Sequence, residues 1–453
     1  MTRDMTSGSP LKSVIQFCIP LFLGMLFQQL YNMVDTMIVG RALGLDALAG
    51  VGSTSSLNGM IVGTCTGITA GFAVPVTQAF GARDHRALRR YVTGSAWLTA
   101  AISLVVTVTV VLLCKQILIA MKTPANALQY AYDYMVVVFA GIPFILLYNL
   151  CVAIIRALGD SRSPLFFLIV SSILNILLDL LFILVFQWGV TGAALATVLA
   201  QGVSGIACLV HMRRHFPILL MQREDWRIEW PAMQRLMVIG LPMGLQVGIT
   251  SAGGIVVQTA FNSFGEHAVA GIAAAQKIYG VLTAPLEALG ATMATYVGQN
   301  VGARKMDRVS LGVKQATILG LAMAAVILVL TLLFGTPMLR LLLGAGEADA
   351  VAFGRRFMLT SMCNLVFLTG VLVYRFSLQG MGYAHLAMLA GVFETIARFF
   401  VAYGLANWFG YAGVCFSNPL AWSMADLFLI PAYVVCLRRL KRRFAAELPA
   451  ESK

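Results

Sequence analysis

Long apolar runs that are almost free of charge most limit what this chain can fold into. A membrane-spanning helix needs about 20 mostly apolar residues, and the 453-residue chain holds about a dozen such runs. They lie near residues 14–40, 50–79, 92–114, 126–155, 164–186, 192–212, 235–263, 268–298, 311–334, 353–378, 385–408 and 412–437. The runs lack the polar and apolar alternation of membrane β-barrel strands. The sequence therefore predicts an all-α polytopic membrane protein with about twelve transmembrane helices.

A dozen spans leave only short connections and no room for a sizeable soluble domain, and the composition argues against a water-soluble fold. Only 11% of the residues are charged, against roughly a quarter in soluble domains. The net charge of +13 would suggest a nucleic-acid partner in a soluble protein, but here the basic residues collect between the runs, so we expect none. Eight cysteines are spread singly without the spacing of zinc ligands, and we predict no metal centre among them.

Basic residues alternate between successive connections. They are frequent before the first run and in every second connection, for example at Arg83, Arg156, Arg304 and Arg375, and again after the last run. Because Lys and Arg mark the cytoplasmic side of membrane proteins, we expect a bacterial inner-membrane protein with both termini in the cytoplasm. Residues 438–453 are predicted to form a basic cytoplasmic tail.

Short motifs recur at a nearly constant offset and indicate a duplication. Gln78 with Gly81-Ala82-Arg83 recurs as Gln299 with Gly302-Ala303-Arg304. The same offset, within one or two residues, relates several glycines: Gly44 and Gly265, Gly159 and Gly382, Gly189 and Gly410. Six spans return the chain to its starting side, so two six-helix lobes would be related by a pseudo-twofold axis along the membrane normal. We predict an N-lobe at 1–212, a cytoplasmic inter-lobe linker at 213–233 and a C-lobe at 234–437, with a cleft between the lobes.

Two acids lie deep inside runs of the first half. A carboxylate in the membrane is costly unless it is neutralised, paired or hydrated, so it is a functional candidate. Helical spacing places Asp35 on a stripe with Gln28 and Asn32, and Asp179 on a stripe with Ser171 and Asn175. Two such stripes can meet, and their acids could bind H⁺ or Na⁺; the alternative is plain hydrogen bonding between helices. Further hydroxyl and amide partners could come from Tyr134, Asn149 and Thr197.

The second half carries different charges. Arg398 occupies the position equivalent to Asn175, so the duplicate has lost the acid site. We predict a polar network of Lys277, Glu287, Glu394 and Arg398. Glu394 and Arg398 are spaced to pair along one helix, which favours a structural ion pair over a substrate contact. Lys277 and Glu287 are too far apart on an unbroken helix and need other partners or a break at Pro285.

Candidate substrate contacts are the polar and soft side chains of an adaptable cleft wall. They are Gln28, Asn32, Met33, Phe261 and Gln276, although most Met and Phe residues in such a chain face lipid or core. Pro20 lies on the same run as Asp35, so a bend there could act as a hinge; a static kink is the alternative. We find no phosphate-binding, zinc-protease or nucleophile motif, so we predict neither an enzyme nor ATP-driven transport, and no cofactor beyond a coupling ion.

These residues resemble the multidrug and toxic compound extrusion (MATE) family over essentially the whole chain. The resemblance is carried by Tyr31-Asn32-Met33-Val34-Asp35, by Val39-Gly40-Arg41 and by the repeated Gln, Gly-Ala-Arg segments. Within the family the sequence is most similar to the DinF-like branch. That resemblance implies an N-lobe proton or sodium site at Asp35, Asn175 and Asp179, supported by Tyr134, Asn149 and Thr197.

The resemblance implies a secondary active antiporter that exports organic, often cationic, amphipathic compounds in exchange for H⁺ or Na⁺ by alternating access. Its partners would be small drugs or metabolites and membrane lipids, and we expect a monomer. The alternative is a flippase for a lipid-linked saccharide or lipid, which should show a strongly cationic cleft. A membrane enzyme or receptor would need a nucleophile, a metal cluster or a signalling domain that the sequence lacks.

Overall fold

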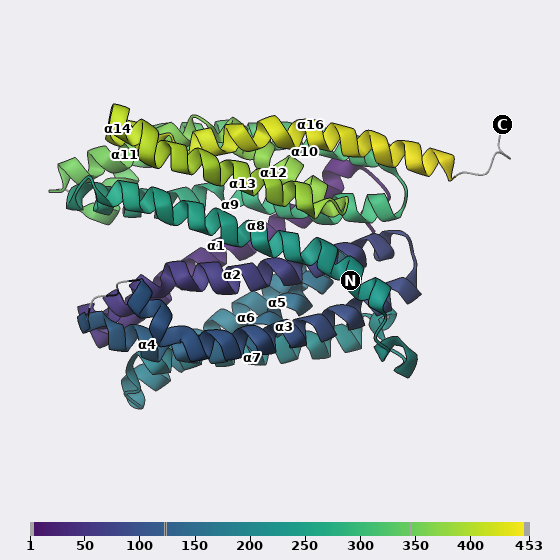
Figure 1. The fold of residues 1–453 in the computed structure, drawn as a ribbon, viewed down its shortest axis with the longest axis horizontal. Helices are drawn as coiled ribbons and strands as arrows, with labels where there is room; N and C mark the ends of the chain where they lie inside the picture. The colour runs from purple at the N-terminus through teal and green to yellow at the C-terminus, as the bar shows by residue number, and fades with distance from the viewer. Residues whose placement is uncertain (1–3, 122, 124, 345, 448–453) are drawn as a thin grey trace. The chain divides into compact units, whose positions relative to one another are not determined.

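The computed structural model describes residues 4–121, 123, 125–344 and 346–447, and within them it holds only helices and their connections (Figure 1). The long helices are α1 (Pro10–Leu43), α2 (Leu45–Gly81), α3 (His85–Ala120), α6 (Arg162–Asp179), α7 (Gly189–His215), α8 (Trp230–Asn262), α9 (Glu266–Gly302), α10 (Met306–Leu343), α13 (Ala384–Phe400) and α16 (Ser417–Ala446). The shorter ones are α4 (Ala125–Ala140), α5 (Ile142–Ala157), α11 (Ala348–Met362), α12 (Leu365–Gly380), α14 (Ala406–Phe409) and α15 (Tyr411–Cys415). The predicted all-α fold is confirmed.

Among the described residues, ten helical segments are long and apolar enough to cross a membrane, and two bent pairs raise the number to twelve. The pairs are α4 with α5, bent by 51°, and α11 with α12, bent by 53°. In the first pair Gly141 precedes α5, whose second residue, Pro143, has no N–H to donate. The second pair breaks at Cys363 and Asn364 without a proline. The number of predicted spans agrees with this count.

The helices run beyond the predicted spans. The run near 92–114 is the middle of α3, which begins at His85 because the Asp84 carboxylate caps it by accepting a hydrogen bond from Ala87 N at 2.9 Å. Hydrophobicity marks the part of a helix that meets lipid, whereas capping decides where the helix ends.

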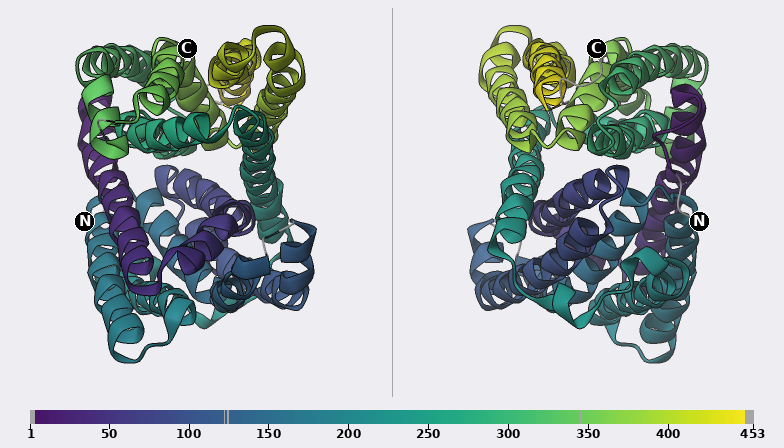
Figure 2. Two further views of the ribbon diagram at one scale, coloured as in Figure 1. Left: turned by 90° about the vertical axis from the view of Figure 1, so that its left-hand side faces the viewer. Right: turned by 90° about the vertical axis from the view of Figure 1, so that its right-hand side faces the viewer.

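By their internal contacts the residues form two compact units, one of Leu23–Gly244 and one of Asp4–Phe22 with Leu245 onward. In the first, α2 packs against α3, α4 and α5, and α7 packs against α4, α5 and α6. In the second, α9 packs against α10, α11 and α12, and α16 packs against α12 and α13. Within each unit the helices run side by side as a bundle (Figure 2). The division falls inside α1, just after Pro20, and inside α8.

The connection between the halves is shorter than predicted. Residues 213–215 belong to α7 and residues 230–233 to α8, so the helices extend into the predicted 213–233 linker from both ends. Within the remaining link, the buried Asp225 forms an ion pair with Arg89 of α3 at 2.8 Å. The predicted basic tail continues α16 as far as Ala446; its residues 448–453, like residues 1–3 of the predicted N-lobe, lie outside the described residues.

The local backbone repeats where the sequence predicts a duplication. Arg83 and Arg304 follow the repeated Gly-Ala motifs, and both adopt positive φ, 57° and 58°. Gly44 and Gly265 precede α2 and α9 with φ of 87° and 89°, a conformation that glycine adopts without steric cost. A π-helical segment follows α6 at Leu180–Val185 and α13 at Val401–Leu405. Equivalent positions in the two halves therefore share the same unusual conformations.

Candidate functional site

Asp35 and Asp179 meet inside the first unit. Asp179 is the last residue of α6, directly before the π-helical segment, and is fully buried. Asp35 lies on α1, and the two carboxyl groups lie close enough to form a hydrogen bond with each other. Because an ionised carboxylate only accepts hydrogen bonds, such a bond requires a proton on one of the two groups. The π-helical turn beside Asp179 is a feature that recurs at functional sites.

Asn175 lies one turn before Asp179 and connects the acid pair to two other helices. With its amide oriented so that donors face acceptors, Nδ2 donates to Asp179 Oδ2 at 3.0 Å and to the Tyr31 hydroxyl at 2.8 Å. In that orientation Oδ1 accepts from Thr197 N at 3.0 Å and Thr197 Oγ1 at 3.3 Å. The amide therefore joins α1, α6 and α7 at one point.

The other predicted members of the site lie around this centre. Tyr134 of α4 is within electrostatic range of both Asp35 and Asp179. Asn149 of α5 donates its own amide to Ile145 O at 2.8 Å, and its side chain lines a pocket of about 90 Å³ together with Gln28, Tyr31, Asn175 and Thr197. All six predicted coupling residues thus belong to the first unit, although the Asn149 nitrogen is already used within its helix.

The carboxyl and hydroxyl groups of the site offer oxygen atoms as ligands, and one carboxylate oxygen has no hydrogen-bond donor among the described residues. Asp179 Oδ1 is buried, and no group among the residues that the structure describes gives it a hydrogen bond. In the described part of the chain no three His, Cys, Asp or Glu side chains gather as a metal cluster. Two carboxyl groups with neighbouring hydroxyls suit a proton or a monovalent cation, since either can satisfy an unpaired buried oxygen.

The predicted substrate contacts divide between the two units. In the first, Gln28 lines the small pocket beside the acid pair, while Asn32 and Met33 are exposed on α1. In the second, Gln276 and Phe261 line a pocket of about 360 Å³. Phe261 is also a core residue, 1% exposed and packed edge-on against Phe357.

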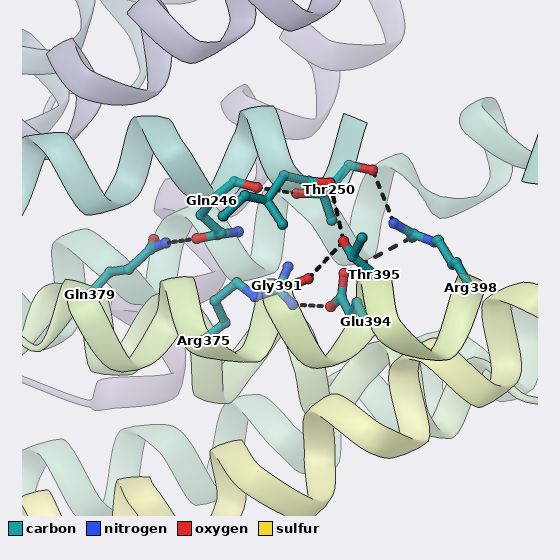
Figure 3. A network of polar contacts seen from close by, with 9 residues as sticks. Gln246, Thr250, Arg375, Gln379, Gly391, Glu394, Thr395 and Arg398 are labelled. Carbon is teal, nitrogen blue, oxygen red and sulfur yellow. Dashed lines mark hydrogen bonds and ion pairs between the residues drawn. The ribbon is translucent and has the colours of Figure 1, made fainter. Parts of the chain in front are cut away.

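A buried ion-pair network occupies the second unit (Figure 3). Arg375 of α12 forms a close ion pair with Glu394 of α13, and both side chains are almost fully buried. Arg398 lies farther from the same acid, with 4.0 Å between its Nη2 and Glu394 Oε2, and donates to Thr250 O at 3.1 Å. The predicted pairing of Glu394 with Arg398 is therefore secondary to the pairing with Arg375.

The placement of Arg375 in a cytoplasmic connection is wrong. The residue is 7% exposed and lies inside α12. A lone arginine near the end of an apolar run is typical of a loop cation, but here the Glu394 carboxylate offsets the cost of burying the charge.

Neither Lys277 nor Glu287 forms an ion pair with any residue that the structure describes. Helix α9 continues through Pro285, so no break brings the two side chains together, and both are exposed in this structure. Tyr279, on the same helix, lies within electrostatic range of Glu287, Glu394 and Arg398. Of the predicted C-lobe network, the structure brings Glu394 and Arg398 together, with Arg375 as the closer partner of Glu394.

Tyr31 is the site residue that sequence reasoning missed. Its hydroxyl is hydrogen-bonded to Asn175 and is also within range of both acids. Its position four residues before Asp35 could have indicated this role, because that spacing places both side chains on one face of the helix.

The MatE family profile matches the chain twice, at residues 20–181 and 242–404. Two curated Bacillus subtilis relatives are similar over most of their length. The probable multidrug resistance protein YpnP is 29% identical over 357 residues, 78% of this chain and 79% of the relative. The probable multidrug resistance protein YoeA is 28% identical over 374 residues, 81% of each.

Among solved structures, an outward-facing multidrug resistance MATE family transporter of the MOP superfamily superimposes with a TM-score of 0.89 at 22% identity, covering 97% of this chain and 98% of that one. These matches confirm a multi-pass membrane transporter rather than an enzyme. Because the family profile covers most of the chain in two successive copies, the chain belongs to the MatE family.

Proposed function

We propose that this MATE transporter is a proton-coupled antiporter of the DinF-like branch that exports organic amphipathic compounds, cationic ones included, across a bacterial inner membrane. MATE transporters are ion-coupled, and the proposal concerns which ion and which residues. The observation that carries it is the close approach of the half-buried Asp35 to Asp179, which is buried beside Asn175. Export of drugs is supported by the names of the B. subtilis relatives, both probable multidrug resistance proteins.

The acid pair couples two opposed fluxes by changing its charge. With protons bound it is neutral, which favours repacking of α1 against α6 and disfavours a bound organic cation. With protons released it carries negative charge, which favours the cation again. Coupling requires that proton and substrate stabilise different conformations. Each proton that moves inward supplies about 2.3 kcal/mol per 100 mV of membrane potential.

The contact between the carboxyl groups supports H⁺ over Na⁺. A shared proton can hold two carboxyl groups within hydrogen-bonding range of each other, and these two lie within that range. A sodium ion would instead lie between the charged oxygens. Reconstituted vesicles given first a pH gradient and then a sodium gradient distinguish the two ions, and we expect export with the first gradient alone.

The decisive variants are Asp35→Asn and Asp179→Asn in the same vesicles. Both should insert into the membrane and lose pH-driven export, because an amide cannot release a proton. Asp307→Asn is the matched control, since Asp307 lies at the exposed start of α10, where it contacts Lys441. Undiminished export by Asp35→Asn would reject the coupling scheme.

Membrane orientation is a second element of the proposal. The basic residues of alternate connections support cytoplasmic termini, and the Arg438 to Arg443 segment of α16 supports a cytoplasmic end for that helix. A cysteine introduced at position 446 and probed with a membrane-impermeant thiol reagent tests this orientation.

The flippase alternative lacks support, because Arg398 is the only cation that lines either polar pocket among the described residues.

A further inference from the structure

The larger polar pocket lies wholly within the second unit. Its volume is about 360 Å³, and side chains of α8, α9, α11, α13 and α16 line it. Phe261 and Phe357 form an aromatic wall, while Gln276, Asn418 and Arg398 supply hydrogen-bond donors. A pocket with an apolar wall and a few polar groups is typical of a site for a small organic molecule.

The charge at this pocket is unbalanced. Arg398, with 13% of its side chain exposed, has Glu394 as its one acidic neighbour in the described part of the chain. That carboxylate is engaged by Arg375, which it contacts much more closely. Asp426, the other acid of the cluster, is within range of Arg375 and Glu394 rather than Arg398. Arg375 thus has two acids within range, whereas Arg398, which faces the pocket, has only the more distant Glu394 among the described residues.

The hydrogen bonds of Arg398 leave donors free. A guanidinium carries five N–H donors, and Arg398 uses one for Thr250 O at 3.1 Å (Figure 3). No other acceptor within hydrogen-bond range is found among the described residues, since Glu394 Oε2 is 4.0 Å away. An almost buried cation with unused donors is stable only beside an anion or water.

We propose that this pocket binds the acidic group of an amphipathic compound, a carboxylate, sulfonate or phosphate, with Arg398 as its counter-ion. The amides of Asn418 and Gln276 lie in the same lining and can donate to the anion, while Phe261 and Phe357 contact the apolar body. Binding itself is independent of the acid pair in the first unit. That the bound compound is a transported one rests on the proposed function, and it extends the substrates to acidic and zwitterionic compounds.

The test uses purified protein in nanodiscs and three probes with one naphthalene body, measured by isothermal titration calorimetry. The probes are 1-naphthaleneacetate, the neutral 2-(1-naphthyl)ethanol and the cationic 2-(1-naphthyl)ethylamine. We expect the acetate to bind at least tenfold more tightly than the alcohol, and the amine more weakly still. Equal binding of the three probes, or tightest binding of the amine, would overturn the proposal.

Two variants locate the binding. Arg398→Gln should reduce acetate affinity to that of the alcohol, and Arg398→Lys should retain part of the preference. The Arg375 and Glu394 pair stays intact in both. Gly254→Leu fills the pocket independently, because Gly254 lines it and a Cβ atom added there meets nothing within 4 Å, and it should abolish binding of all three probes. Unchanged acetate binding in either Arg398→Gln or Gly254→Leu contradicts the assignment.

Two control variants and a change of lipid distinguish this anion site from surface cations, from the coupling acids and from a lipid-binding site. Arg340→Gln removes an exposed cation of α10 and should leave acetate binding unchanged. Asp35→Asn should bind acetate like the wild type even though it transports nothing, so loss of coupling and loss of this site are distinguishable. In phosphatidylglycerol nanodiscs the acetate should bind as in phosphatidylcholine if small compounds are the ligand; tenfold weaker binding there assigns the anion site to a lipid headgroup.

Discussion

The buried pair of Arg375 and Glu394 predicts an asymmetric response to mutation. Arg375→Met removes one of two cations that face the same acid, and Arg398, 4.0 Å away, can move to replace it. Glu394→Gln instead removes the carboxylate that both guanidinium groups face, so that Arg375 keeps only Asp426 within range and Arg398 keeps no acid among the described residues. Removal of one partner of a buried ion pair costs about 3–5 kcal/mol when the other charge is left alone. We expect that cost for Glu394→Gln.

For Arg375→Met we expect a smaller loss, about 1.5–3 kcal/mol, comparable to one charged hydrogen bond. The double variant, Arg375→Met with Glu394→Gln, should lose less than the sum of the two single variants, because the cation that Glu394→Gln deprives of its close partner is itself removed and only Arg398 is left without an acid. The stability of the two single variants and the double variant can be measured from the midpoints of their unfolding in detergent, which tryptophan fluorescence follows. Arg398→Gln alone is the control, since it leaves the close pair in place.

A larger stability loss for Arg375→Met than for Glu394→Gln would contradict this prediction. If Arg375→Met destabilises the protein more than Glu394→Gln, Arg398 does not serve as a reserve partner. If the two single effects simply add in the double variant, the groups do not interact energetically, and the cluster is a set of independent hydrogen bonds.

Three further predictions follow from other contacts. Gly271→Ala should lower stability by about 1–3 kcal/mol, because the added carbon would lie 2.2 Å from Ala350 O of α11; Gly59→Ala, where nothing lies within 4 Å, should be neutral or slightly stabilising in the same unfolding assay. Tyr31→Phe should slow pH-driven export about two- to tenfold, as expected for one lost hydrogen bond, and an unchanged rate would remove Tyr31 from the site. Burial raises the pKa of the Asp160 carboxyl, but hydrogen bonds from Ser163 outweigh it and hold the pKa below its usual value. The Asp160 carboxylate therefore stabilises the folded protein fully above the unfolded pKa of about 3.9, and this contribution is lost as the pH falls through the pKa of the folded state. Asp160→Ala should lower the free energy of unfolding by about 1 kcal/mol at pH 7. The difference in stability between this variant and the wild type should shrink at pH 3.5.

Local properties of the sequence determined the helices and the repeat. In lipid every backbone polar group must be satisfied within its own helix, so each long apolar run specifies a span wherever it lies. The helical period likewise places Asn175 and Asp179 on one face of α6 from their spacing alone. The repeated Gly-Ala-Arg segments indicated equivalent turns, and Arg83 and Arg304 do share the left-handed conformation.

Contacts between side chains of different helices could not be predicted from these local sequence patterns. Tyr31 shares a face with Asp35 by spacing, but only the approach of α6 makes it a partner of Asn175. Arg375 has the sequence context of a loop cation, and only the approach of α13 provides the Glu394 carboxylate that allows its burial. The period of a helix is a property of the chain itself, whereas the energy of a buried charge depends on which helix packs beside it, and that was decided by the tertiary structure.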